Sequence, residues 1–258
     1  AIELLKKIIS EDTELKGNIE ETKKELSKQK EIIIKKLAES EAYDNAKRQF
    51  DENTEKVYEA EVDKLYEYIQ FSDSIMYDAE EGLYYRDAKY VYPKHKSANG
   101  KKDFWARGDG WVLAGFAKVL KDLPEDNAHR DEYIQIYTKM AQAVKNCQQP
   151  EGYWTRSMLD KGHAPGPETS GTAFFTYGIL WGINNGLLSD KEYWPTVEKA
   201  WNYLTTVALQ PDGRVGYVQP IGERAIPGQV VDTHSTANFG VGAFLLAACE
   251  MVRYIDNQ

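Results

Sequence analysis

The sequence has few of the residues that support metal, disulfide or phosphate chemistry. Of its 258 residues, two are cysteines (Cys147 and Cys249) and four are histidines. Two distant cysteines make no disulfide framework, and because each lies in an apolar helical pattern we expect buried free thiols. The scattered histidines lack the spacing of zinc ligands, and no glycine-rich phosphate loop is present, so we expect no metal and no cofactor.

Clustered positive charge and long apolar runs are scarce as well. The net charge of -9 and the pI near 5.1 argue against a nucleic-acid partner, since a phosphate backbone requires clustered Lys and Arg. Without an apolar run of about 18 residues, we expect no membrane-spanning segment. The sequence starts at Ala1 without the apolar core of a signal peptide, so we expect a processed or engineered start, which leaves the compartment open.

Glycine, proline and tryptophan are nearly missing from the first part of the sequence. All six tryptophans and 18 of the 19 glycines lie at or beyond Gly82. Residues 1–64 are rich in Lys and Glu, with apolar residues at roughly heptad spacing: Leu15, Ile19, Leu26, Ile33 and Leu37. Because Thr22 and Gln29 interrupt this seam, we predict solvated amphipathic helices, with a helix–helix partner through 1–64 as the alternative.

The second part repeats a helical pattern. Three apolar segments open with small residues, and their starts are about 61 and 69 residues apart: Gly110–Leu120, Gly171–Leu180 and Gly240–Ala248. Amphipathic segments near 131–148 and 193–209 lie between them, each followed by a Gln-Pro-acid-Gly turn. A helix that is apolar on nearly all sides must be buried, and amphipathic helices can cover it, so we predict concentric inner and outer rings of helices.

The loops ahead of the inner helices carry the candidate site. They supply Trp105, Arg107, Asp109 and Trp111, then Glu168, Thr169 and Ser170, then His234. Acidic and hydroxyl side chains at a helix start can be plain caps. Their recurrence at equivalent places predicts instead a shared funnel, in which aromatic faces contact sugar rings and an arginine pairs with a uronate carboxylate. His163 lies in a Gly- and Pro-rich loop that either closes over this site or is a simple surface loop.

These loops and helices resemble glycoside hydrolase family 105, the unsaturated rhamnogalacturonyl hydrolases, and the related unsaturated glucuronyl hydrolases. The resemblance covers about 65–258. It is carried by the stretches Trp105–Trp111, Glu168–Thr172 and Phe239–Leu245, with support from Gly82–Arg86 and Val119–Pro124. The domains are therefore predicted as 1–64, unrelated to the family, and 65–258, a toroid-like domain.

The resemblance implies an all-α fold, a partial or rebuilt (α/α)6 toroid. It also implies removal of a 4,5-unsaturated uronic acid from the end of an oligosaccharide, without a cofactor, by a soluble protein of the cytoplasm or periplasm. A carboxylic acid protonates C4 of the vinyl ether, water adds at C5, and the hemiketal collapses. On this basis Asp109 and Glu168 are the catalytic candidates, and the substrate-binding candidates are Arg86, Trp105, Arg107, Trp111, Thr169, Ser170, His163 and His234.

The sequence departs from the family at several points. The upstream general-acid motif, of the form Asp-x-Leu-Phe-Met, is not found before Leu65, and Arg86 and Asp109 stand where relatives often have His and Asn. The residues are also too few for six helical hairpins. Three explanations stay open: an engineered or recombined chain, a natural remnant that binds sugar without catalysis, or a missing half supplied by another chain.

Two rival readings belong to other classes. Gln148–Trp154 resembles the Gln-x-x-x-Gly-x-Trp repeat of the terpenoid cyclases, which also have double helical rings, but their Asp-rich motif is absent. A catalytically inactive or engineered sugar-binding or scaffold protein is the stronger alternative, because the acid motif is missing.

Overall fold

The structure is a computed structural model that describes residues 17, 20–36 and 41–257, without the side chains of 41–43. It divides into two compact units, Ala1–Leu65 and Tyr66–Gln258. In the first unit residues 20–36 are helical, and Leu26 and Ile33 of the predicted seam are exposed. The remaining seam positions, Leu15, Ile19 and Leu37, lie outside the described residues. Helix α2 (Glu41–Met76) begins in the first unit and ends in the second.

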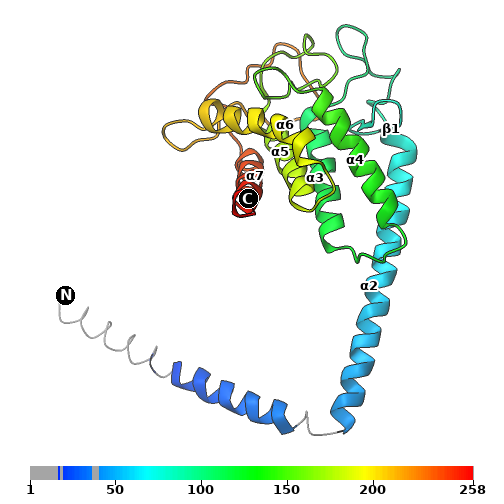
Figure 1. Cartoon of the computed structure of the whole chain (residues 1–258), viewed down its shortest axis with the longest axis vertical. Helices are drawn as coiled ribbons and strands as arrows, with labels where there is room; N and C mark the ends of the chain where they lie inside the picture. The colour runs from blue at the N-terminus through cyan, green and yellow to red at the C-terminus, as the bar shows by residue number, and fades with distance from the viewer. Residues whose placement is uncertain (1–16, 18–19, 37–40, 258) are drawn as a thin grey trace, which may run out of the picture. The chain divides into compact units, whose positions relative to one another are not determined.

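The second unit is helical apart from one short hairpin (Figure 1). Its elements after α2 are β1 (Tyr77–Asp78), β2 (Leu83–Tyr84), α3 (Ala106–Asp122), α4 (Arg130–Asn146), α5 (Thr169–Asn184), α6 (Asp190–Tyr203), the π-helical turn η1 (Leu204–Ala208) and α7 (Asn238–Asp256). The two strands pair antiparallel, Tyr77 with Tyr84 and Asp78 with Leu83. The prediction of an all-α domain is confirmed.

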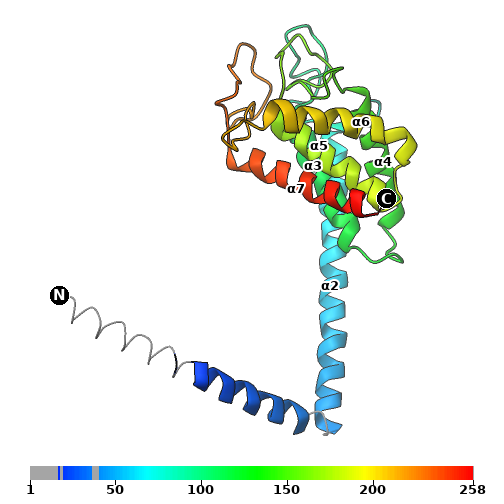
Figure 2. The same cartoon turned by 60° about the vertical axis from the view of Figure 1, so that its left-hand side comes forward.

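Helix α5 is the centre of this unit. It packs against α3 on one side and α7 on the other (Figures 1 and 2). Residues 169–182 are all buried. Glycine makes the α3–α5 contact close. A Cβ added to Gly110 would lie 2.9 Å from the Cβ of Phe174, and one added to Gly171 would lie 2.9 Å from the Ala106 backbone. The small residues that open the predicted inner helices therefore let neighbouring backbones approach.

The amphipathic helices cover these inner helices, as the pattern predicts. Helix α4 packs on both α3 and α5 and buries Tyr137 and Met140, among others. Helix α6 packs on α5, and its Trp194 stacks on Tyr254 of α7 with ring centroids 4.4 Å apart. The turns after the outer helices are confirmed too, because Gly152 and Gly213 have φ values of 95° and 83°, which favour glycine.

Helix α7 differs from the sequence-based expectation in two respects. Cys249 is exposed, whereas we expected a buried thiol; the reason is that α7 has a neighbour on one side only among the described helices. By length and composition α7 is also apolar enough to cross a membrane. That test is passed equally by core helices of helical bundles, and α7 carries Glu250 and Arg253 and packs on α5.

Candidate functional site

A short segment, residues 217–220, joins the loops that precede α5 and α7. The Tyr217 carbonyl accepts from the Thr169 amide at 2.9 Å, and the Gln219 amide donates to Glu168 Oε1 at 3.0 Å. On its other side, the Val218 amide donates to the Ser235 carbonyl at 2.9 Å. Tyr217 has a φ of 57°, a conformation that non-glycine residues seldom adopt and that often marks a functional site. We call residues 217–220 the clasp.

Arg107, in the first turn of α3, connects that helix to this clasp. Its guanidinium donates to the Gln219 carbonyl at 2.5 Å and to the Pro220 carbonyl at 3.0 Å. It also lies over two aromatic rings, those of Trp105 and Phe239, with centroids at 4.6 and 4.5 Å. Burial lowers the pKa of Arg107, while the charge of Glu168 acts in the opposite direction. The result is a cation held at the point where three loops meet.

Glu168 caps the N-terminus of α5. Its carboxylate accepts from the Ser170 amide at 3.2 Å, the Ser170 hydroxyl at 2.7 Å and the Gly171 amide at 2.6 Å, in addition to the Gln219 amide. The side chain is fully buried. The four donors at the start of α5 satisfy both oxygens of this buried side chain and tie the loop to the helix. This geometry suits a positioning role for Glu168.

Glu168→Gln is expected to lower the free energy of unfolding by about 2 kcal/mol, because the amide group turns a donor toward amides that need an acceptor. Urea denaturation would measure the loss. Glu151→Gln, in the turn after α4 where residue 151 is exposed, is the matched control and should leave the urea midpoint unchanged. An equal midpoint for the Glu168 variant would contradict the capping role.

Asp109 occupies a different environment. It lies in the first turn of α3, and Oδ1 accepts from the Tyr84 amide of β2 at 2.8 Å. The other oxygen, Oδ2, is buried without a hydrogen-bond partner, and the residue has no exposed surface. Burial raises the pKa of Asp109 well above its usual value, since the charged form is poorly solvated there. A raised pKa suits a proton donor, but the side chain has no exposed surface through which it could touch a sugar.

The two tryptophans of this loop have opposite exposures. Trp105 is buried, and its indole Nε1 donates to Gln219 Oε1 at 2.8 Å. Trp111 is 53% exposed, and its ring packs against Phe174 with centroids 4.5 Å apart. Trp105 therefore stabilises the clasp, whereas about half of the Trp111 side chain is open to solvent.

The hydroxyl residues at the start of α5 face inward. Thr169 is buried and its hydroxyl pairs with that of Tyr203 at 2.7 Å. Ser170 is buried as well, with its hydroxyl on Glu168. Both hydroxyl groups bond to protein groups and so stabilise the loop before α5. Neither residue has exposed surface for a sugar.

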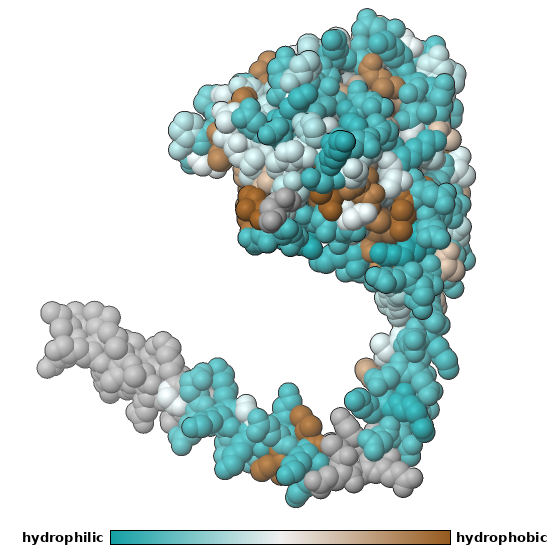
Figure 3. Space-filling view, in the orientation of Figure 1, coloured by the Kyte–Doolittle hydropathy of each residue, from teal (hydrophilic) through white to brown (hydrophobic). Residues whose placement is uncertain are grey.

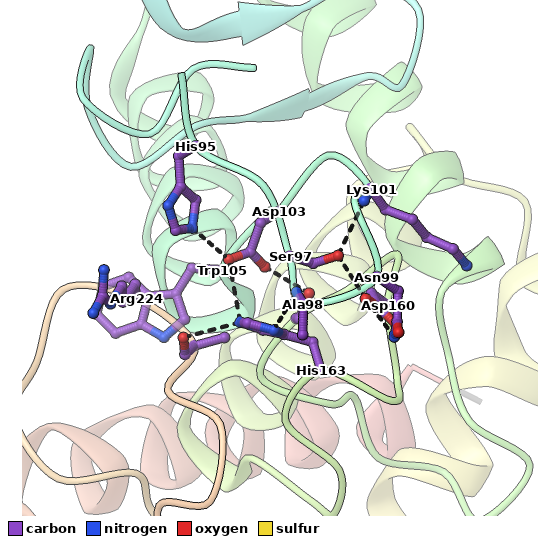
Figure 4. Close-up of polar contacts among 12 residues, drawn as sticks. His95, Ser97, Ala98, Asn99, Lys101, Asp103, Trp105, Asp160, His163 and Arg224 are labelled. Atoms are coloured by element: carbon purple, nitrogen blue, oxygen red, sulfur yellow. Dashed lines mark hydrogen bonds and ion pairs between the residues drawn. The ribbon is translucent and has the colours of Figure 1, made fainter. Parts of the chain in front are cut away.

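His163 belongs to a buried polar cluster that joins two loops (Figure 4). Its Nδ1 accepts from the Ala98 amide at 2.8 Å, and its Nε2 lies 3.7 Å from Asp103. Asp103 in turn accepts from the Ser157 hydroxyl at 2.6 Å and lies 2.9 Å from His95 Nε2. His163 thus holds the loop 155–168 against residues 95–103.

Arg86 and His234 are not brought to the clasp. Arg86 pairs with Asp87 and lies 3.7 Å from Glu223, at the surface. His234 is exposed and its Nδ1 lies 3.1 Å from Arg214. Of the three residues expected to share a cavity mouth, Arg107 and Glu168 are linked through Gln219, and His234 stands apart.

Sequence reasoning missed Gln219 and Arg156. Gln219 is fully buried and touches residues more than 50 positions away, which leaves no local pattern to detect. Arg156 is a second buried guanidinium, which donates to the carbonyls of Gln229 at 2.9 Å and Pro165 at 2.8 Å. Among the residues that the structure describes, no group of three or more His, Cys, Asp and Glu side chains could hold a metal.

Residues 35–255 match the family model for Glycosyl Hydrolase Family 88. The chain belongs to this family. The match begins within the segment 1–64, for which the sequence predicts no relation to the family, so only 1–34 lies wholly before it.

Its relatives are longer. Over 177 residues the chain is 41% identical to an unsaturated 3S-rhamnoglycuronyl hydrolase of Alteromonas sp. (strain LOR), covering 69% of this chain and 41% of that protein. A family 88 glycosyl hydrolase from Bacteroides vulgatus is 67% identical with a TM-score of 0.73, covering 75% of this chain and 56% of the other. A solved polysaccharide lyase is 74% identical with a TM-score of 0.74, over 76% and 56%. The chain thus spans about half the length of these relatives.

The resemblance inferred from the sequence is confirmed at the level of family and fold. A possible member of family 105 from Salmonella enterica shares the fold at 24% identity with a TM-score of 0.59. The helices α3–α7 are part of an (α/α)6 toroid, and the second unit is a partial toroid.

Proposed function

We propose that the loops before α3, α5 and α7 bind an oligosaccharide that ends in a 4,5-unsaturated uronic acid. We also propose that the chain takes part in removing this terminal sugar by hydration of its vinyl ether. Membership of family 88 and the name of the Alteromonas relative support this reaction class. The observation that carries the proposal is the exposed ring of Trp111 in the first turns of α3, beside the loops that the clasp joins. An exposed aromatic face is what a sugar ring packs against, whereas Arg107 is buried on the Gln219 and Pro220 carbonyls and positions these loops.

The burial of both candidate acids favours a second function, sugar binding without turnover. A proton donor to C4 must touch the sugar, and neither Asp109 nor Glu168 has exposed surface. In this second function both carboxyl groups position the loops. Any turnover of the bound sugar would then require an acid from outside the described residues.

Two measurements on the purified chain separate these functions. Calorimetry with an unsaturated disaccharide and its saturated counterpart reports binding, and the ultraviolet absorbance of the double bond reports turnover. Binding with falling absorbance supports hydration, and binding at constant absorbance supports the sugar-binding protein. Rising absorbance on intact polysaccharide would indicate lyase activity, which is the activity in the name of the solved relative that is 74% identical. Absence of binding would contradict both proposals.

Trp111→Ala is expected to weaken binding of the unsaturated disaccharide about fivefold, since one aromatic contact with a sugar ring contributes about 1 kcal/mol. The variant should unfold at nearly the same urea concentration, because about half of the side chain is already exposed. Phe71→Ala, which removes another exposed aromatic ring on α2, is the control for both measurements. Equal affinities of the Trp111 and Phe71 variants would reject a role for Trp111 in binding.

A further inference from the structure

Two asparagines of this chain are followed by glycine, in the pairs Asn99–Gly100 and Asn185–Gly186. Such a pair can lose the side-chain amide spontaneously, because glycine has no side chain to shield its backbone nitrogen. That nitrogen attacks Cγ of the asparagine and a C–N bond forms, while the bond from Cγ to Nδ2 breaks and ammonia leaves with the proton of the glycine amide. Water then opens the cyclic imide at either carbonyl, which gives aspartate or isoaspartate. A fold controls this reaction by holding or freeing the glycine nitrogen.

The pair Asn185–Gly186 is held by the end of α5. The Asn185 amide and its side-chain Nδ2 both donate to the Trp181 carbonyl, at 3.1 and 2.7 Å. The Gly186 amide donates to the Ile183 carbonyl at 3.1 Å. Before the Gly186 nitrogen can reach Cγ, the last turn of this central helix must come apart, and Trp181 within it is buried. We therefore expect the folded chain to protect this pair.

The pair Asn99–Gly100 lies instead in an exposed turn, residues 98–101 without helical structure. The Gly100 amide donates to the Ser97 carbonyl at 3.0 Å, and the Ser97 amide donates to the Lys101 carbonyl at 2.9 Å. The surface of the second unit is mainly hydrophilic around its loops, so water has access to them (Figure 3). An exposed turn opens at a lower cost in free energy than a packed helix, so the Gly100 nitrogen can be freed while the core stays folded.

The side chain of Asn99 joins this turn to a second loop (Figure 4). Its Nδ2 donates to both carboxylate oxygens of Asp160, at 2.9 and 3.0 Å. Asp160 is buried and also accepts from the Ser97 hydroxyl at 2.5 Å. Burial raises the pKa of Asp160, but the hydrogen bonds from Ser97 and Asn99 outweigh it, and the pKa lies below its usual value. The Asn99 amide is thus matched to a buried carboxylate.

We propose that Asn99 is a deamidation site, and that its conversion weakens the junction between residues 95–103 and the loop 155–168. The new carboxylate faces Asp160 at the place of the lost hydrogen bonds, so an attraction becomes a repulsion between two like charges. Isoaspartate also adds a methylene to the backbone of the turn. The proposal concerns the chain itself and does not rest on the proposed function.

Ageing of the purified chain locates the site. The folded chain is kept in mildly alkaline buffer at body temperature, and peptide mass spectrometry follows the replacement of each amide by a carboxyl group. Asn99 should convert about tenfold faster than Asn185, or more, because only its turn opens locally. In urea the fold is lost, and the two rates should agree within a factor of about two. Equal rates in the folded chain would contradict the proposal, and so would an Asn99 that stays intact while the urea sample converts.

Asn99→Asp reproduces one product directly. It should lower the urea midpoint and speed tryptic cleavage after Lys161 several-fold, since this exposed lysine lies in the loop that the junction holds. Asn127→Asp is the matched control, because the Asn127 side chain accepts from the His129 amide at 2.9 Å and a carboxylate keeps that role. If the two variants have the same midpoint and the same cleavage rate, position 99 does not hold the loops together.

A double-variant cycle tests whether Asp160 is the group that opposes the new charge. Asn99→Asp in an Asp160→Asn background places an amide opposite the new carboxylate, so the pair is restored with its partners exchanged. The fall in urea midpoint caused by Asn99→Asp should then shrink at least about twofold. A fall of the same size in both backgrounds would show that the effect arises elsewhere and would reject repulsion by Asp160 as its cause.

Discussion

Replacement of Arg107 by methionine is expected to lower the free energy of unfolding by about 4 kcal/mol. The guanidinium makes two charge-assisted hydrogen bonds to buried carbonyls, of Gln219 and Pro220, and each is typically worth about 1.5–3 kcal/mol. Methionine keeps much of the packing between Trp105 and Phe239 but leaves both carbonyls without a donor. The loss should therefore exceed that of an ordinary surface substitution several-fold.

Arg107→Lys separates charge from geometry. A lysine ammonium keeps the charge but has its donors on a single nitrogen, so it cannot reach both carbonyls as the two guanidinium nitrogens do, and we expect about half of the stability loss of the methionine variant. Urea denaturation monitored by tryptophan fluorescence is a suitable measurement, because Trp105 lies against the altered side chain. Arg214→Met is the control: that arginine is partly exposed at the surface, where it contacts Asp212 and His234. If the Arg107 and Arg214 variants unfold at the same urea concentration, the clasp does not depend on Arg107.

The helices of this chain are more visible in its sequence than its site. Apolar periodicity and small opening residues locate the inner helices, because a helix such as α5 must hide every face and glycines such as Gly110 must admit a neighbour. The same patterns locate the outer helices to within a few residues. Those constraints act within one helix or between adjacent repeats, so they leave a local signature.

The contacts that build the site act over much longer separations. Trp105 and Gln219 are 114 positions apart, and no pattern around Gln219 announces the bond. The exposure of Cys249 had a different cause: the sequence shows that α7 is apolar, but the number of its neighbours depends on how many helices complete the ring. His234 lies in the loop before α7, as Glu168 lies in the loop before α5, yet its side chain contacts Arg214, and the type of side chain alone does not determine that contact.

Asp109→Asn is expected to stabilise the protein increasingly as the pH rises. Burial raises the pKa of this carboxyl group well above its usual value, so the folded state keeps a proton that the unfolded chain releases above about pH 4. Between these two pKa values the folded state binds one more proton than the unfolded state, and the free energy of unfolding then falls by about 1.4 kcal/mol per pH unit. Asparagine has nearly the same shape, keeps an acceptor for the Tyr84 amide and has no proton to lose.

The difference between the variant and the unchanged chain should be small near pH 4 and grow by about 1.4 kcal/mol per pH unit until the pH passes the folded pKa. Urea midpoints across this range measure it. Asp212→Asn is the matched control with the opposite sign: hydrogen bonds from Arg214 lower the pKa of Asp212, so its charge stabilises the folded state above the unfolded pKa, and the variant should lose stability there. A constant difference between Asp109→Asn and the unchanged chain at every pH would show that Asp109 is charged in the folded state.

The same variant also decides what Asp109 does in any turnover of an unsaturated uronide. A general acid that protonates C4 is typically worth a factor of about 100 or more in rate, so its loss would lower kcat accordingly. A positioning residue would leave kcat nearly unchanged and alter only stability and its pH dependence. Because the carboxyl group has no exposed surface and its one hydrogen bond joins α3 to β2, we expect the second result. A large fall in kcat with unchanged affinity would instead require that β2 moves aside when the sugar binds.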